Sequence, residues 1–247
     1  MSTQEFTIAD RTVLVTGANR GIGRALVDEA LRAGAKRVYA GTRKPLTHPD
    51  DRVTPLILDV TDAAQIRAAT ERVDALDVLV NNAGLGLLDD LGDRAELERH
   101  LAVNLFGTHA VTQAFLPQLT RSRGAVVNVL SLVALASLPA MPAYSISKAA
   151  AFSLTQSLRA MLAPRGIRVH AVLTGPVDTD MVRGLEIPKA TPESVARAIF
   201  GGVADGDEEI FPDEMSASFA PNWAAGAVKV LERGNAGVPA LINGEVS

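Results

Sequence analysis

Short runs of apolar, mostly β-branched residues alternate with longer stretches of helical periodicity over the first two thirds of the chain. The apolar runs are nearly continuous, which is typical of strands that helices cover on both faces of a parallel sheet. This alternation predicts an α/β fold with a doubly wound parallel sheet of about seven strands. We expect strands at residues 12–15, 37–40, 54–59, 78–81, 125–130 and 168–173, and a short seventh strand at 208–211.

The intervening segments carry the apolar periodicity of helices. We expect helices at residues 20–33, 63–73, 95–119, 143–162 and 192–203. Pro192 suits the first turn of the last of these helices, and Thr191 suits its N-cap. After Pro212 the pattern weakens, apart from a helical pattern around 222–233. Because no repeat, low-complexity segment or linker interrupts the 247 residues, we expect a single domain, 1–247, with a variable C-terminal tail at 213–247.

Composition narrows the class of partners and the compartment. A net charge of −4 without any basic tract argues against nucleic acid and anionic membrane surfaces as partners. The absence of cysteine excludes a disulfide framework and a thiolate nucleophile, and it fits a reducing compartment. Residues 1–10 are acidic and polar, unlike a signal peptide. The expected location is therefore the cytoplasm.

One long uncharged stretch, between Arg123 and Lys148, needs a separate interpretation. It contains Asn128, several serines, Pro139 and Pro142, which a membrane-spanning helix would tolerate poorly. A buried strand that leads into a loop of the functional site is the better interpretation, so no membrane association is expected.

Three glycines lie between the first predicted strand and the first predicted helix, at Gly17, Gly21 and Gly23. Glycine permits a tight turn there and lets a pyrophosphate approach the backbone, while the helix N-terminus offers free N–H groups and a positive dipole end. The spacing therefore predicts a dinucleotide-binding Rossmann fold. The alternative is that the glycines only permit a tight strand-to-helix turn.

The tip of the second strand reads the adenosine ribose in dinucleotide-binding folds. Here it consists of Thr42, Arg43 and Lys44, without any acidic residue. A carboxylate would repel a 2′-phosphate, whereas Arg43 can bind it bidentately and Arg20 can approach from the glycine turn. We therefore expect NADPH/NADP+ as the cofactor. The alternative is that these residues are surface cations, above all Lys44.

A group suited to carbonyl chemistry follows in the second half of the chain. Tyr144 and Lys148 are four residues apart in a predicted helix and share one face, and Ser131 follows a predicted strand at the carboxyl edge of the sheet. A free tyrosine has a pKa of about 10, so we expect the Lys148 ammonium to favour the phenolate. Tyr144 would then be the general acid in reduction and the general base in oxidation, and Ser131 would polarise the carbonyl.

These motifs together resemble those of the short-chain dehydrogenase/reductase family, whose members have a Gly-x-x-x-Gly-x-Gly turn and a Ser/Tyr-x-x-x-Lys site. Three further matches are Asn81-Asn82-Ala83-Gly84, Asp59-Val60 and Asn104. The resemblance implies that Asn104, Ser131, Tyr144 and Lys148 are catalytic, with Asn104 completing a proton relay through a lysine-bound water. It also implies that Lys148 holds the nicotinamide ribose and that Thr42 takes the position of the aspartate of NAD-preferring members.

More residues are assigned to the cofactor than to catalysis, by the glycine turn, the strand tip and the resemblance together. It comprises Gly17, Asn19, Arg20, Gly21, Ile22, Gly23, Thr42, Arg43, Asp59, Val60, Asn82, Ala83, Gly84, Tyr144, Lys148, Val177 and Thr179. The plainer alternatives are a turn cap for Asp59, a satisfied polar residue in a helix for Asn104, and a packing role for Tyr144.

The chain departs from the family pattern at two places. Thr174-Gly175-Pro176 stands where the family usually has Pro-Gly after the sixth strand, although Thr179 can still reach the nicotinamide carboxamide. The glycine-rich last strand of many tetrameric members is missing, which puts the usual tetramer in doubt. We therefore expect either a homodimer or a homotetramer.

The substrate site is expected around the segment 178–191, with Val133 and Met181 as lining residues. Leu85, Leu87, Leu88, Leu138 and Val182 either line the same apolar pocket or belong to the core or an interface. His48, His100, His109 and His170 lack the spacing of metal ligands, so no metal is expected and they are interpreted as surface or packing residues.

The sequence therefore predicts an NADPH-dependent carbonyl reductase, reversible as a secondary-alcohol dehydrogenase, for an apolar ketone or aldehyde. One alternative is a cofactor-free lyase similar to the halohydrin dehalogenases, which replace the lysine by arginine and lose the glycine turn; Lys148 and the glycines are intact here. The other alternative is a regulator that senses NADPH without turnover.

Overall fold

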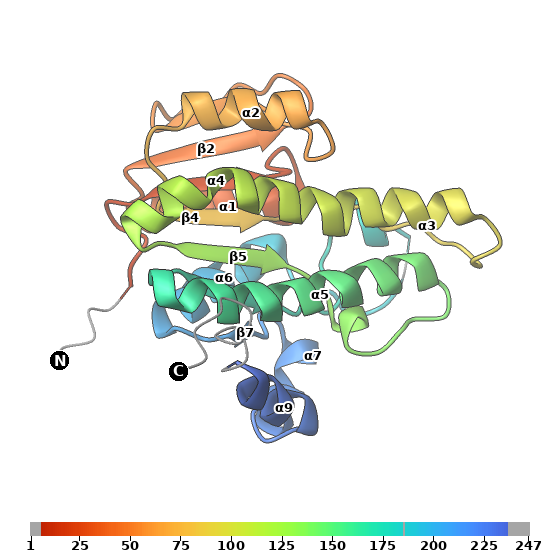
Figure 1. The fold of residues 1–247 in the computed structure, drawn as a ribbon. Coiled ribbons are helices and arrows are strands. Elements are labelled where there is room, and N and C mark those ends of the chain that lie inside the picture. Colours follow the sequence, from red (N-terminus) through yellow and green to blue (C-terminus); the bar gives the residue numbers. More distant parts are fainter. Residues whose placement is uncertain (1–5, 185, 237–247) are drawn as a thin grey trace.

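Seven parallel strands form one sheet in the order β3-β2-β1-β4-β5-β6-β7 (Figure 1). The structure is a computed structural model that describes residues 6–184 and 186–236. The strands are β1 Thr12–Thr16, β2 Arg37–Thr42, β3 Val53–Ile57, β4 Val78–Asn81, β5 Ala125–Val129, β6 Arg168–Val172 and β7 Glu209–Ile210. The strand order reverses between β1 and β4, which is where ligands bind in folds of this kind. The predicted doubly wound α/β fold is confirmed.

Helices cover both faces of this sheet (Figure 1). One face carries α1 Gly21–Arg32 and α6 Pro192–Asp205, and the other carries α2 Ala63–Arg72, α4 Thr108–Ser122 and α5 Pro142–Leu162. The helix α3 Arg94–Leu101 extends from the carboxyl edge, and α7 Glu214–Ala217, α8 Ala220–Trp223 and α9 Ala227–Asn235 follow the last strand. No helix among the described residues is long and apolar enough to cross a bilayer.

The central strand β1 shows why the apolar runs are continuous. Val13 and Val15 point into the core cluster that contains Leu26 of α1, whereas Leu14 between them points into the cluster that contains Phe115 of α4. All five side chains are fully buried. Because both faces of the strand pack against helices, its three central positions are all apolar.

Two predicted helices are interrupted in the structure. The predicted helix 95–119 is divided into α3 and α4 by a π-helical turn at Ala102–Gly107. Such turns occur often at functional sites, and this one contains Asn104. The pattern at 222–233 is likewise split into α8 and α9, because Gly226 has an extended backbone between them. Both interruptions are corrections to the predicted element boundaries.

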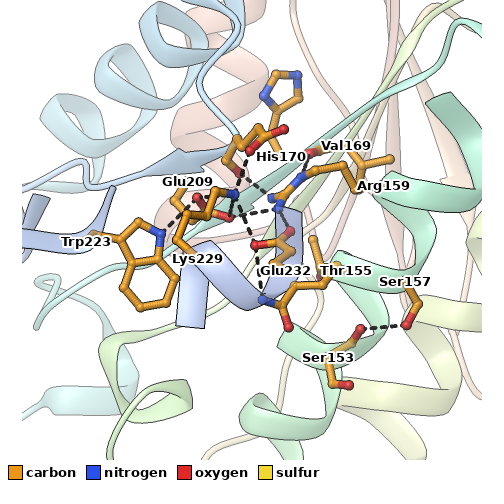
Figure 2. Close-up of polar contacts among 12 residues, drawn as sticks. Ser153, Thr155, Ser157, Arg159, Val169, His170, Glu209, Trp223, Lys229 and Glu232 are labelled. Atoms are coloured by element: carbon orange, nitrogen blue, oxygen red, sulfur yellow. Dashed lines mark hydrogen bonds and ion pairs between the residues drawn. The ribbon is translucent and has the colours of Figure 1, made fainter. Parts of the chain in front are cut away.

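A buried network of charged side chains holds α9 against β7 and α5 (Figure 2). The Lys229 ammonium lies 2.9 Å from Glu209 and 3.0 Å from Glu232, and Arg159 binds both of these carboxylates. The indole N–H of Trp223 donates to Glu209 at 2.9 Å. The side chains of Lys229 and Glu209 are each only 3% exposed. The C-terminal helices are therefore fixed to the sheet by charge pairing as well as by apolar contacts.

Candidate active site

The turn between β1 and α1 requires glycine for steric reasons. Gly17 and Gly21 have φ angles of +66° and +52°, a region that L side chains rarely adopt. A β carbon at Gly23 would lie 2.1 Å from the carbonyl oxygen of Gly17. Arg20, the N-cap of α1, makes no side-chain cap, so the N–H groups of the first turn keep the capacity to bind an anion.

The loop after β4 locks onto this turn. The side-chain amide of Asn82 donates to the carbonyl oxygens of Thr16 and Gly17 at 2.9 and 3.2 Å. In return, the Thr16 hydroxyl accepts from the backbone N–H groups of Asn82 and Ala83 at 3.0 Å each. A β carbon at Gly17 would lie 2.9 Å from the Cα of Ala83. The two loops at the reversal of strand order therefore form one rigid surface.

The two arginines proposed to bind a 2′-phosphate differ in whether they already have an ion-pair partner. Arg43 at the end of β2 is exposed and has no ion pair with any described residue. Arg20 pairs with Asp180, which also pairs with Arg183. Thr42 is buried, and its hydroxyl donates to the carbonyl oxygen of Lys44 at 2.6 Å. Of the two arginines, Arg43 is the one already available to an anion.

The residues that follow β3 have local partners. The Asp59 carboxylate accepts from the N–H and the hydroxyl of Thr61 at 2.9 and 2.7 Å, which is the turn-capping role that the sequence left open. Val60 is buried, and a β carbon at Gly107 would lie 2.7 Å from its Cγ2 atom. Their proposed contact with the cofactor remains a prediction.

Tyr144 and Lys148 lie on successive turns of α5 and point to the same place. The Lys148 Nζ atom is 5.8 Å from the centre of the Tyr144 ring and donates to the carbonyl oxygen of Val129 at 2.8 Å. Val129 is the last residue of β5, and Ser131 follows it two residues later. The Ser131 hydroxyl donates to the carbonyl oxygen of Thr174 at 3.3 Å and lies close enough to the Tyr144 phenol to lower its pKa. The structure thus brings the three predicted catalytic side chains together.

Burial dominates the protonation of this group. It raises the pKa of Tyr144 to about 12, and the hydrogen bond with Ser131 offsets only part of that shift. Burial also lowers the pKa of Lys148 to about 8. The expectation that the ammonium lowers the tyrosine pKa is therefore corrected: removal of the phenolate from water has the larger effect. Tyr144 is held in its proton-donating form.

Asn104 binds the loop that follows Gly84. Its side chain accepts from the N–H of Leu85 and donates to the carbonyl oxygen of Leu85, both at 2.8 Å, and it also donates to the hydroxyl of Ser147. A β carbon at Gly84 would lie 3.4 Å from Asn104 Oδ1 and 3.6 Å from Lys148 Nζ. Asn104 is thus a neighbour of the lysine, while its role in a proton relay remains a prediction.

The predicted substrate-site residues border Tyr144 as well. A β carbon at Gly86 would lie 2.9 Å from the sulfur of Met181 and 3.3 Å from the Tyr144 ring, so both side chains lie next to Gly86. The backbone N–H of Val133 donates to the Ser131 hydroxyl at 3.4 Å. Met181 is 46% exposed, so part of its side chain stays available to a ligand.

The last two cofactor residues lie on the loop after β6. A β carbon at Gly21 would lie 2.9 Å from Cγ2 of Thr179, so Thr179 touches the glycine turn. Val177 is buried and pairs with Ala190, and the N–H of Asp178 donates to the Ala190 carbonyl at 2.9 Å. The ends of this loop are therefore joined next to the glycine turn.

One histidine has a structural role that its position in the sequence did not indicate. His100 is fully buried, its Nδ1 atom lies 2.7 Å from the carbonyl oxygen of Glu96, and its Nε2 atom accepts from the N–H of Leu87 at 3.2 Å. Its ring centre is 6.5 Å from that of Tyr144. His100 therefore supports the loop beside Tyr144. No spacing rule could have identified it, because the loop and the helix meet only in the folded chain.

Comparison with known proteins agrees with this geometry. The family model described as short chain dehydrogenase matches residues 11–189. An uncharacterized short-chain type dehydrogenase/reductase, y4vI, of Sinorhizobium fredii is 36% identical over 91% of this chain, although the match spans only 43% of that protein. The 3-oxoacyl-acyl-carrier-protein reductase of Aquifex aeolicus is 33% identical over 80% of this chain and 87% of that protein.

A solved structure extends the similarity to three dimensions. It is a short chain dehydrogenase from Burkholderia cenocepacia in complex with NADP, with a TM-score of 0.85 and 36% identity. The match covers 92% of this chain and 98% of that chain.

Proposed function

The chain belongs to the short-chain dehydrogenase/reductase family, and on that basis we propose that it is an NADPH-dependent carbonyl reductase, reversible as a secondary-alcohol dehydrogenase. As a member of this family it is an oxidoreductase that uses a nicotinamide dinucleotide. The observation that carries the proposal is the convergence of Ser131, Tyr144 and Lys148 at the carboxyl edge of the sheet. Such an arrangement suits proton transfer to a carbonyl oxygen.

The residues around the reversal of strand order fit a dinucleotide. The glycine turn and the uncapped N-terminus of α1 suit a pyrophosphate, and Lys148 would hold the hydroxyls of the nicotinamide ribose. The preference for NADPH is supported by Arg43 at the end of β2, whose guanidinium has no ion pair within residues 6–184 and 186–236, and by the lack of a carboxylate at that strand tip. A relative with 36% identity that was solved with NADP is consistent with this preference.

When bound, the reduced nicotinamide supplies a hydride to the carbonyl carbon, and the oxidised form accepts one from the alcohol. Tyr144 donates its phenolic proton to the oxygen on which negative charge develops, and in the reverse direction its phenolate takes that proton back. Ser131 donates a hydrogen bond to the same oxygen and orients it. The Lys148 ammonium stabilises the phenolate that remains after the proton has left.

We propose an uncharged, apolar ketone or aldehyde as the substrate. Three loops at the carboxyl edge of the sheet present exposed apolar side chains next to the catalytic group. They are Leu87 at 39%, Leu88 at 78%, Leu138 at 45% and Met181 at 46% exposure. An apolar substrate would remove part of this surface from water, at about 25 cal/mol per Å².

We also propose a cytoplasmic homo-oligomer. The lack of cysteine fits a reducing compartment, and the exposed side chains of Ile146 and Met161 on α5 supply apolar surface for self-association. Light scattering on a gel-filtration column measures the mass, and a strictly monomeric protein at micromolar concentration would contradict the oligomer.

The proposed reaction is tested by the loss of NADPH absorbance with a panel of ketones and aldehydes. The chain has only two tyrosines, so Tyr39→Phe is a matched control for Tyr144→Phe. We expect Tyr144→Phe to lower kcat by roughly 10²- to 10⁴-fold with NADPH binding retained, and Tyr39→Phe to behave as the parent. Equal rates in both variants would show that Tyr144 is not the general acid. Tight NADPH binding without turnover of any carbonyl would instead favour the alternative that the protein is a regulator that senses NADPH.

A further inference from the structure

The helix that carries Tyr144 and Lys148 receives its N-terminal cap from a distant loop. Met141, at the N-cap position of α5, makes no side-chain cap, and Pro142 has no N–H to offer. The N–H of Ala143 is therefore the first donor of the helix. Both carboxylate oxygens of Asp89, in the loop after β4, accept from this N–H at 3.2 Å.

Asp89 makes two further contacts that hold its loop in place. Its own N–H donates to the carbonyl oxygen of Ala140 at 3.4 Å, and its carboxylate accepts from the N–H of Leu91 at 3.1 Å. The residue is half-buried, so water competes only in part for these bonds. Asp89 thus connects the loop to the chain directly before α5 and to the helix itself.

The same loop forms the wall beside the catalytic tyrosine. It is held by Asn104 at Leu85 and by His100 at Leu87, and a β carbon at Gly86 between them would lie 3.3 Å from the Tyr144 ring. Asp89 is the third attachment point of this loop. Asn104 also links the loop to α5, through Ser147, whereas Asp89 binds the first turn of the helix. The distance between the loop and Tyr144 therefore depends on the bonds of Asp89.

We propose that Asp89 is a positioning residue, which acts through the first turn of α5 to hold the Tyr144 phenol at the right distance from the substrate. This inference rests on the proposed role of Tyr144 as the proton donor. Because Ala143 directly precedes Tyr144, a shift of that turn moves the phenol. A misplacement of about 1 Å at a reacting group can lower a rate by about 100-fold.

A cap can also act on stability alone, and a second aspartate provides the comparison. Asp93 is the N-cap of α3 and accepts from the N–H of Ala95 at 2.8 Å. It has the same chemistry as Asp89 and lies four residues further along the chain, but the first turn of α3 carries none of the predicted catalytic residues. Asp93→Ala therefore removes a cap without touching the turn that carries Tyr144.

The first experiment measures kcat, KM for the carbonyl substrate and for NADPH, and Tm in three variants. We expect Asp89→Ala to lower kcat at least tenfold with little change in KM for NADPH. Asp89→Asn keeps an acceptor oxygen and should retain at least half of kcat. Asp93→Ala should lower Tm by as much as Asp89→Ala yet leave kcat within twofold. A kcat for Asp89→Ala equal to that of Asp93→Ala, or an equal loss in Asp89→Asn, would overturn the proposal.

The second experiment needs no turnover, so it separates this inference from the proposed function. In a Tyr39→Phe background Tyr144 is the only tyrosine, and 3-fluorotyrosine labelling then yields a single ¹⁹F resonance. We expect Asp89→Ala to shift or broaden this resonance, while Asp89→Asn and Asp93→Ala leave it in place. An unchanged resonance in Asp89→Ala overturns the positioning role. A changed resonance in a protein that turns over no carbonyl contradicts only the proposed reaction.

Discussion

Asn104 and Leu85 form a closed pair of hydrogen bonds, in which one side-chain amide satisfies both backbone groups of one loop residue. Each bond is 2.8 Å long. The pair joins the π-helical turn between α3 and α4 to the loop that lies beside Tyr144. The asparagine is fully buried, so its amide has no water as a replacement partner.

Asn104→Ala should therefore loosen this loop. The N–H and carbonyl of Leu85 would lose their partners, which we expect to lower the free energy of unfolding by about 1–3 kcal/mol and to reduce kcat together with it. Denaturant titration and hydrogen exchange at Leu85 measure the two effects. Normal turnover with fast exchange at Leu85 would show that the loop position does not matter for the reaction.

The pH dependence should follow Lys148. Burial lowers its pKa to about 8, so the ammonium is present below pH 8 and is lost as the pH rises through that value. The pKa of Tyr144, raised to about 12, keeps the phenol protonated over the same range. We expect kcat/KM for NADPH in the reductive direction to be constant below pH 8 and to fall up to tenfold per unit above it. A profile that stays level to pH 10 would contradict the requirement for an ammonium.

Arg43 should decide between the two dinucleotides. Removing it in Arg43→Ala deletes a charged hydrogen-bond donor worth about 1.5–3 kcal/mol, so we expect KM for NADPH to rise roughly 10- to 100-fold while KM for NADH changes little. Lys44→Ala is the neighbouring control and should have a small effect. An equal rise of KM for both dinucleotides in Arg43→Ala would mean that this side chain does not contact the 2′-phosphate.

The buried charge network should be sensitive to the loss of a single partner. Lys229→Met would leave Glu209 and Glu232 with only Arg159 to neutralise them, at a cost of about 3–5 kcal/mol of unfolding free energy (Figure 2). Glu208, whose side chain is 49% exposed, also pairs with Lys229, and Glu208→Gln should cost less than about 1 kcal/mol. Thermal unfolding measures both. Similar losses in the two variants would show that burial does not govern the network.

The sequence alone was enough for the order of the main elements and for the three side chains that the fold brings together at the candidate site. Continuous apolar runs identify strands covered on both faces, as in β1, because the side-chain pattern records burial directly. The four-residue step from Tyr144 to Lys148 places both on one helix face by local geometry. The glycines of the turn mark positions that exclude a side chain: Gly17 and Gly21 have positive φ angles, and a β carbon at Gly23 would lie 2.1 Å from the carbonyl oxygen of Gly17. Each of these signals depends only on residues that are close together in the chain, so the sequence alone shows it.

Only the tertiary structure decided which distant residues meet. Asp89 and Ala143 are separated by 54 positions, and Arg20 and Asp180 by 160, so their pairing depends on the path of the whole chain. The same holds for the protonation of the site: spacing places an ammonium near a phenol, but burial raises the pKa of Tyr144. Hydrogen-bond partners and solvent exclusion arise from packing in three dimensions, and no local pattern of residue types records them.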